Sequence, residues 1–412
     1  MVAPRPFRAA TKAPSPASEE ITMAHARLEG LDLEVLRARK SEKWHTYPAD
    51  ILPAWVAEMD FPLAEPIQRV LSEAVERWDV GYPVAAGRTG IREAFAERME
   101  EHFGWAVEPR DVEVVSEVVQ GLYLCLGAFA KPGEGVLVQT PVYPPFLLGV
   151  AETGRRLVEN QLVVGKDGWE IDFDALEAGT DAETHLFLLC NPHNPSGRVF
   201  GRAELERLAE FALARDLVVV ADEIHADLVY DGAVHIPFAS LSPEVAARTI
   251  TLNSASKSFN IAGLRCAVAH FGGPELRTRF DAHASRHARG GLGMLGLYTT
   301  IAAWREGQPW LDEVVRHLEA NRDYLMGELA SRFPEIECQS PQGTYLAWLD
   351  CSRLDWPGSP ADRFMKYGKV ALSDGIDFGE NFGAWARLNF ATSREILAEV
   401  LDRMETAIRD GD

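Results

Sequence analysis

The stretch HLFLLCNPHNPSGRVFGRAELERLAEFALARDLVVVAD, residues 185–222, decides the fold, because it reads as strand, turn, helix and strand in succession. Its two ends, 185–190 and 217–222, are short apolar runs typical of strands that are buried on both faces of a parallel sheet. Between them, residues 202–215 carry apolar side chains at three- and four-residue spacing, which is typical of an amphipathic helix. The alternation predicts an α/β fold with helices on both faces of the sheet.

Three further apolar runs predict strands of the same sheet: GVLVQ at 135–139, TITLNS at 249–254 and CAVAHF at 266–271. The link between the last two runs is too short for an ordinary covering helix. A strand of opposite direction is therefore expected near that edge, because only parallel neighbours require a long crossover connection.

The C-terminal third has a different pattern. Residues 310–333 predict one long amphipathic helix, and 344–350 and 385–391 predict strands. Thr392 and Glu395 have the spacing of a capping box that opens the last helix.

A chain of 412 residues exceeds one hydrophobic core, so more than one domain is expected. The Pro- and Ala-rich start lacks the apolar core of a signal peptide and predicts a disordered tail. The predicted division is a disordered tail at 1–24, a segment at 25–75 that contributes to the small domain, a large domain at 76–304 and a small α/β domain at 305–412.

Composition excludes several classes of partner. The chain is 47% apolar and carries a formal net charge of −21, which argues against nucleic acid and anionic membranes as partners. Its five cysteines are far apart and include no C-x-x-C pair, so a reducing cytoplasm is the expected location. No apolar run approaches the length of a membrane span.

Polar residues follow the ends of the predicted strands. Asn194 follows the run at 185–190, Asp222 closes the run at 217–222, and Ser254, Ser256 and Lys257 end the run at 249–254 or follow it. The carboxyl ends of parallel strands meet at one edge, where ligands bind in open α/β sheets. We therefore expect these side chains to share one site.

Lys257 is unusual because the nearest acidic residues in sequence are Glu244 and Glu275. An apolar, uncharged neighbourhood lowers the pKa of an ammonium group and frees the nucleophilic amine. Serines and Arg265, eight residues after the lysine, are typical of a phosphate cradle. A lone lysine, a carboxylate and a phosphate site together suggest pyridoxal 5′-phosphate (PLP) as cofactor.

At this point the sequence resembles the fold-type I, class I/II aminotransferases. The resemblance is carried by S-x-S-K with an arginine eight residues later, by N-P-H-N-P-S-G and by the A-D-E that ends a strand. Within that family, WVAEMDF at 55–61, TPVYPPF at 140–146, ADEIHADL at 221–228 and PQGTYLAWLD at 341–350 are similar to the MalY/PatB-type cystathionine β-lyases. The resemblance runs from about residue 28 to the C-terminus. It implies a large domain with a mostly parallel mixed sheet and a smaller α/β domain.

The resemblance also implies roles for individual residues at the cofactor. Lys257 would be the Schiff-base lysine and the base for the Cα proton, Asp222 would pair with the pyridinium nitrogen, and Asn194 would contact the phenolic oxygen. The phosphate would be held by Ser254, Ser256, Arg265 and the backbone N–H groups of Gly121 and Leu122 at the opening of a helix.

The remaining implied roles concern the ring face, the substrate and the partner subunit. Tyr143 would stack on the cofactor ring, and Arg387, with Ala57 and Asn194, would bind the substrate. Tyr82 would reach the phosphate of a neighbouring subunit, which implies a homodimer. His225 stands in the cofactor pocket where many transaminases have a tyrosine.

The implied reaction is α,β-elimination from cystathionine or a related cysteine S-conjugate, giving a thiol, pyruvate and ammonia. Aminotransfer to a keto acid shares the early steps and is the main alternative. A non-catalytic protein that keeps the fold as a binding module is a third.

Other motifs in the sequence give little support for a further function. The chain has no G-x-x-x-x-G-K that would make Asp222-Glu223 part of a nucleotide-binding site. G-x-G-x-x-G within 290–296 follows a charged helical pattern, not a strand, and predicts a tightly packed helix. His283 and His287 have metal-like spacing, but arginines surround them, so a solvated helix face and no metal site are expected.

Overall fold

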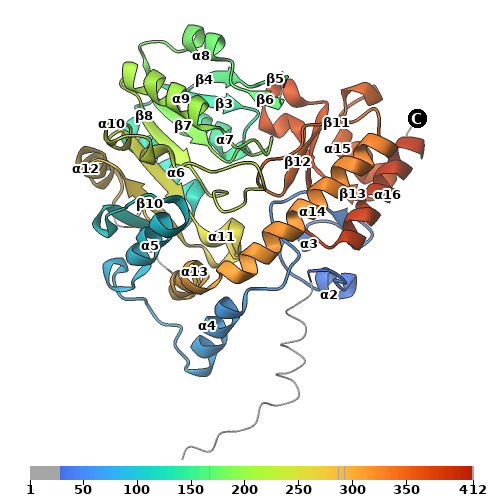
Figure 1. Cartoon of the computed structure of the whole chain (residues 1–412), viewed down its shortest axis with the longest axis horizontal. Helices are drawn as coiled ribbons and strands as arrows, with labels where there is room; N and C mark the ends of the chain where they lie inside the picture. Colours follow the sequence, from blue (N-terminus) through green and yellow to red (C-terminus); the bar gives the residue numbers. More distant parts are fainter. Residues whose placement is uncertain (1–27, 167, 286, 292, 411–412) are drawn as a thin grey trace, which may run out of the picture.

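The computed structural model describes residues 28–410 except 167, 286 and 292. The tail predicted at 1–24 lies outside the described residues. Two main sheets organise the chain, one in the middle of the sequence and one near the C-terminus (Figure 1).

The larger sheet has seven strands in the order β2-β10-β9-β8-β7-β3-β4. Their bounds are β2 Val112–Val115, β3 Gly135–Thr140, β4 Arg156–Gln161, β7 Thr184–Cys190, β8 Val218–Asp222, β9 Thr249–Asn253 and β10 Ala267–Phe271. The strands from β9 to β4 are parallel, and β10 runs antiparallel to both β9 and β2. The predicted α/β fold with a strand of opposite direction is confirmed.

Both faces of this sheet are buried, as the continuous apolar runs predict. Val218 and Val220 of β8 belong to one hydrophobic cluster, and Val219 and Ala221 belong to another. The first cluster includes residues of α6 (Val118–Phe129), α7 (Pro144–Glu152) and α12 (Pro274–His283). The second includes residues of α8 (Phe173–Gly179) and α9 (Arg202–Ala214). Burying a polar side chain within these strands costs free energy unless it is hydrogen-bonded, so the strand ends are the favourable positions for polar residues.

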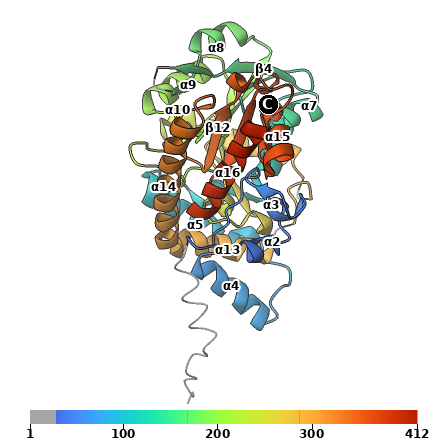
Figure 2. The same ribbon diagram turned by 90° about the vertical axis from the view of Figure 1, so that its right-hand side faces the viewer.

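The smaller sheet is antiparallel, with the order β11-β12-β15-β14. Its strands are β11 Glu337–Cys338, β12 Leu346–Asp350, β14 Ser373–Asp374 and β15 Trp385–Asn389. The long helix α14 (Gln308–Arg332) lies beside α16 (Arg394–Asp410) in both Figure 1 and Figure 2. The boundary predicted at 304/305 falls in the last turn of α13 (Met294–Glu306), just before α14, and the domain division stays a prediction.

The N-terminal segment reaches both parts of the molecule. Strand β1 (Leu52–Pro53) pairs in parallel with β13 (Val370–Ala371), while α4 (Glu65–Glu76) packs on α13. The remaining α-helices and strands of the described residues are α2 Leu33–Arg37, α3 Glu42–His45, α5 Ile91–Phe103, β5 Val163–Gly165, β6 Gly168–Glu170, α10 Pro243–Ala246, α11 Ala255–Ser258 and α15 Pro360–Arg363.

Two local predictions are wrong. Helix α16 begins at Arg394, and the hydroxyl of Ser393, not Thr392, accepts from the N–H of Ile396 at 3.4 Å. The helix predicted at 290–296 begins only at Met294. Within it, Gly296 packs so closely that a Cβ there would lie 2.2 Å from the carbonyl oxygen of Leu264.

Within the described residues, no helix is long and apolar enough to cross a membrane. No group of three or more His, Cys, Asp or Glu side chains that could hold a metal ion is found in the described part of the chain.

Helix α9 offers a matched test of the buried sheet face. Leu208 is fully buried in the second cluster, whereas Leu213, on the same helix, is 39% exposed. Leu208→Ala is expected to lower the free energy of unfolding by about 2–5 kcal/mol through lost contacts and a cavity. Leu213→Ala is expected to change it by about 0.5 kcal/mol or less. Equal losses in urea denaturation would contradict this packing.

Candidate active site

A cavity of about 730 Å³ lies at the carboxyl edge of the parallel strands. It is lined by many of the residues that the sequence predicts for the site: Ala57, Tyr143, Asn194, Asp222, His225, Ser254, Ser256, Lys257, Arg265 and Arg387. These residues come from both sheets and from the N-terminal segment, so the fold brings together positions far apart in sequence.

Asn194 is fixed by the turn that follows β7. The side chain of Asn191 accepts from the N–H of Phe200 at 3.0 Å, and His193 bonds Ser196 at 2.7 Å. Gly197 closes the turn with φ +69°, and a Cβ there would lie 2.6 Å from the side chain of Pro341. This conformation explains the glycine that ends N-P-H-N-P-S-G.

Lys257 lies on the short helix α11 directly after β9. Its Nζ lies 2.9 Å from the carbonyl oxygen of Ala57, to which it donates. Removal from bulk water, reinforced by the positive charge of Arg387, lowers the pKa of Lys257 to about 8. About a tenth of the Lys257 side chains are therefore neutral amines at pH 7.

Asp222 is 5% exposed at the end of β8. Burial raises the pKa of its carboxyl group to about 7, although Oδ1 accepts from the N–H of Ile224 at 3.1 Å. His225 is also buried, and burial with the nearby charges of Lys257 and Arg387 lowers its pKa to about 3. The imidazole is therefore neutral at physiological pH.

Arg387 lies on β15 of the smaller sheet and is 4% exposed. Its guanidinium donates to Asn194 Oδ1 at 2.9 Å, to the carbonyl of Trp55 at 2.9 Å and to the hydroxyl of Ser373 at 3.0 Å. Burial lowers the pKa of Arg387 to about 10, so the group still carries its charge at pH 7. Within the described residues it has no ion-pair partner, which suits it to an anionic ligand.

Another part of the cavity lining has the features of an anion site. Helix α6 begins at Val118, and Ser116, Glu117, Val118 and Val119 line the cavity at its N-terminus. First-turn N–H groups and the helix dipole favour anions there. Arg265 lies at the same end, 3.2 Å from the Glu117 carboxylate.

The two serines of the site, Ser254 and Ser256, differ in their surroundings. The hydroxyl of Ser254 donates to the carbonyl of Cys266 at 2.6 Å and accepts from the N–H of Ser256 at 3.0 Å. It must leave the Cys266 carbonyl before it can donate to a bound anion. Ser256 lines the cavity at the first turn of α11.

The predicted helix opening at Gly121 and Leu122 is wrong. Helix α6 starts three residues earlier, and the N–H of Gly121 already donates to the Glu117 carbonyl at 3.0 Å. A Cβ on Gly121 would lie 3.1 Å from Leu252, so this glycine serves close packing on β9. Neither residue lines the cavity.

Tyr82 also lies outside the cavity of its own chain, and its side chain is fully exposed. Sequence reasoning missed other lining residues, including Glu117, Val118, Val119 and Asn260. The signal for Glu117 was weak, because the strand before it has only four residues and is interrupted by Glu113.

The fold and this cavity define an α/β enzyme with a reactive lysine between a carboxylate and an anion site. Residues 61–404 match the sequence profile of the family "Aminotransferase class I and II", and the chain belongs to that family. The chain is 37% identical over 361 residues to "Cystathionine beta-lyase PatB" of Bacillus subtilis (strain 168), which covers 87% of this chain and 93% of that protein.

Two solved structures extend the similarity. The structure titled "Crystal Structure of OvoB" has a TM-score of 0.87 and 40% identity, and the match covers 91% of this chain and 98% of the other. The "PLP-bound C-S lyase from Staphylococcus hominis" has a TM-score of 0.84 and 29% identity, with 90% and 96% coverage. The family resemblance and the fold that it implies are confirmed.

The raised pKa of Asp222 makes stability depend on pH in the chain without bound ligand. Between about pH 4 and pH 7 the folded carboxyl group holds a proton that the unfolded chain has lost. Stability therefore falls as pH rises through this window, by at most about 1.4 kcal/mol for each pH unit.

Asp222→Asn removes this titration, so the variant is expected to gain stability relative to wild type as pH rises from 4 to 7. Urea denaturation of both proteins across this range measures the difference. A difference that stays constant with pH would contradict the burial of an ionisable Asp222.

Proposed function

We propose that this protein is a PLP-dependent carbon–sulfur β-lyase that acts on cystathionine or a related cysteine S-conjugate. The reaction consumes one water molecule and breaks the Cβ–S bond, giving a thiol, pyruvate and ammonia. The observation that carries the proposal is Lys257, an amine whose pKa is lowered to about 8 in a cavity that also holds Asp222 and Arg387. The names of the similar lyases support the same reaction.

The donor set of the cavity fits PLP. Asp222 is a buried carboxylate for a ring nitrogen, and the α6 N-terminus with Ser256 and Arg265 suits a phosphate. Because Asn194 Oδ1 accepts from Arg387, its amide nitrogen is free to donate to a ring oxygen. Bound PLP supplies an aldehyde that captures amines and a protonated ring that withdraws electrons from the substrate.

Lys257 is proposed as the residue that binds the cofactor aldehyde and then removes the Cα proton. Its pKa of about 8 lies close to the operating pH, where a general base works best. The buried Asp222 would be held ionised by a charged N–H partner, since a hydrogen bond to the charged form lowers a carboxyl pKa.

Arg387 is proposed to bind the substrate carboxylate with its planar fork, next to Asn194 and Ala57. Tyr143 also lines the cavity, and burial raises the pKa of its hydroxyl, so it stays neutral and can stack on a ring. The neutral His225 would keep the cofactor pocket free of an additional positive charge.

The lyase reaction is tested with cystathionine as the only organic substrate. Pyruvate is expected to accumulate over many turnovers without a keto-acid acceptor, as measured by coupled lactate dehydrogenase. Lys257→Ala is expected to lower kcat by about 10³-fold or more, because the chain loses its general base. Borohydride reduction is expected to trap the cofactor on the peptide that contains Lys257.

The matched control is Lys131→Ala, because the Lys131 side chain is 86% exposed and lies outside the cavity. This variant is expected to keep wild-type activity. Pyruvate formation that requires a keto-acid acceptor would favour aminotransfer instead. Bound PLP without any turnover would favour a binding module.

A homodimer and a cytosolic location are further parts of the proposal. From the last turn of α4 onward, the chain exposes several apolar side chains in one segment: Val75 (67%), Trp78 (90%), Val80 (63%) and Tyr82 (102%). Contiguous exposed apolar residues are typical of an interface. A second copy would cover them, and Tyr82 would then reach the partner's phosphate site. The five cysteines are free, which supports a reducing cytosol.

The dimer is tested by sedimentation, where wild type is expected at twice the mass of one chain. Trp78→Asp with Val80→Asp is expected to shift the protein to monomers, because two charges would be buried. Leu213→Asp, on a partly exposed position of α9, is expected to leave the mass unchanged. Tyr82→Phe is expected to keep the dimer but raise the Kd for PLP by about ten-fold through one lost hydrogen bond. A monomeric wild type would contradict the shared site.

A further inference from the structure

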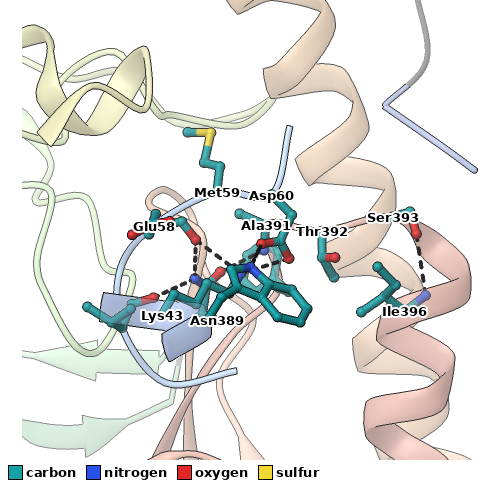
Figure 3. A network of polar contacts seen from close by, with 12 residues as sticks. Lys43, Glu58, Met59, Asp60, Asn389, Ala391, Thr392, Ser393 and Ile396 are labelled. Atoms are coloured by element: carbon teal, nitrogen blue, oxygen red, sulfur yellow. Dashed lines mark hydrogen bonds and ion pairs between the residues drawn. The ribbon is translucent and has the colours of Figure 1, made fainter. Parts of the chain in front are cut away.

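The segment Trp55–Asp60 lies against the cavity and is held by side chains from other parts of the fold (Figure 3). Its backbone groups are bonded by side chains and backbone along its whole length. The carbonyl of Ala57 accepts from Lys257 at 2.9 Å and from the hydroxyl of Tyr345 at 3.0 Å. The segment therefore presents a backbone acceptor to the lysine of the site.

The same segment also contacts the arginine of the site and the turn that follows the helix of the lysine. Arg387 donates to the carbonyl of Trp55 at 2.9 Å. Asn260, three residues after Lys257, bonds both the N–H and the carbonyl of Met59 at 2.9 Å. A displacement of the segment would therefore change the surroundings of both Lys257 and Arg387.

One buried ion pair anchors this segment. Lys43 and Asp60 are each 1% exposed, and their charged atoms lie 2.8 Å apart. The second oxygen of Asp60 accepts from the indole N–H of Trp44 at 2.7 Å. Lys43 also donates to the carbonyl of Glu58 at 3.2 Å, which Asn389 reaches at 2.7 Å.

Figure 3 shows Lys43, Glu58, Asp60 and Asn389 converging on one short length of backbone. The backbone of Asp60 is held as well, because its N–H donates to the carbonyl of Ala391 at 3.0 Å. Burying two charges is costly unless geometry and additional hydrogen bonds compensate for it. Here the ion pair and its hydrogen bonds hold a loop whose carbonyls at Trp55 and Ala57 accept from Arg387 and Lys257.

We propose that Lys43 and Asp60 are positioning residues, which hold the Ala57 carbonyl where it receives the amine of Lys257 whenever that amine is free. The ion pair touches neither the lysine nor the cavity, so it acts through the backbone between Ala57 and Asp60. The consequence for catalysis rests on the proposed function: between substrate capture and proton removal, Lys257 must be free and correctly placed.

The physical consequence is a change in the proton affinity of Lys257. A carbonyl acceptor stabilises the ammonium form through a charge-assisted hydrogen bond, while burial and Arg387 oppose that form. If the segment is no longer anchored, this acceptor is lost and the amine becomes less basic.

The experiment measures how the rate of Lys257 acylation in the full chain depends on pH, and the midpoint of this dependence reports the pKa of the amine. Dialysis against an aldehyde-trapping amine first removes any bound PLP. Exposed Lys131 serves as the internal reference in the peptide mass spectrum. The test variant is Lys43→Met with Asp60→Leu, which removes the pair without leaving an unpaired buried charge. In this variant the acylation midpoint of Lys257 is expected about one pH unit below that of wild type. A shift of this size corresponds to the weakening of one charge-assisted hydrogen bond. In the enzyme loaded with PLP, kcat is expected to fall about ten-fold.

The matched control is Arg98→Met with Asp227→Leu. This pair is also buried, with side chains 2% and 6% exposed and a 2.6 Å contact, but it does not hold the segment. It is expected to leave the Lys257 midpoint unchanged, as is the conservative variant Lys43→Arg. If the double variant of Lys43 and Asp60 fails to fold, Asp60→Asn carries the same expectation.

If the acylation midpoint of Lys257 in the test variant equals that of wild type, the proposal is overturned. An upward shift also overturns it, because it would mean that water replaces the carbonyl. Equal shifts in the test and control pairs also overturn it. Acylation is read without cofactor or substrate, so absence of lyase activity would refute the proposed function and leave this result readable.

Discussion

The structure depends on one constraint: the central parallel strands are buried on both faces. Residues such as Val218, Val219, Val220 and Ala221 pack alternately into two clusters, so no polar side chain can be placed within the strand without a large cost. In the central sheet, the charged side chains that face the cavity lie at the strand ends or beyond them. Because the strands from β9 to β4 run in one direction, Asn194, Asp222 and Lys257 emerge at the same edge and face one cavity. The same low-polarity surroundings lower the pKa of the lysine and raise that of the aspartate.

Much of this could be predicted from the sequence. The continuous apolar runs identified the central strands to within a residue or two, and the short link before CAVAHF identified the reversed strand β10. The edge strands β2 and β4 were missed. The burial of β4 alternates, as on the edge of a sheet, and β2 has only four residues and is interrupted by Glu113, so neither shows a continuous apolar run.

The site was predictable where a residue follows a strand, and less so elsewhere. The start of α6 was misplaced because Glu117 caps it without a side-chain hydrogen bond, so no Ser, Thr, Asp or Asn marks the boundary. The carbonyls of Trp55 and Ala57 had no signal as acceptors in composition or spacing. Their partners lie 332 and 200 residues away in the chain, and backbone atoms carry no residue-specific pattern.

The antiparallel strand β10 has a consequence for how this chain can vary. Because β10 returns beside β9, Lys257 and Arg265 share a single connection of 13 residues between Asn253 and Ala267. Both strand ends are pinned by ladder hydrogen bonds, so the reach of this loop is fixed. Substitutions within the loop change chemistry at one position, whereas an insertion or deletion would displace the lysine and the arginine together. Chain length in this loop is therefore constrained more tightly than its composition, and related chains would be expected to differ here in residues but not in spacing.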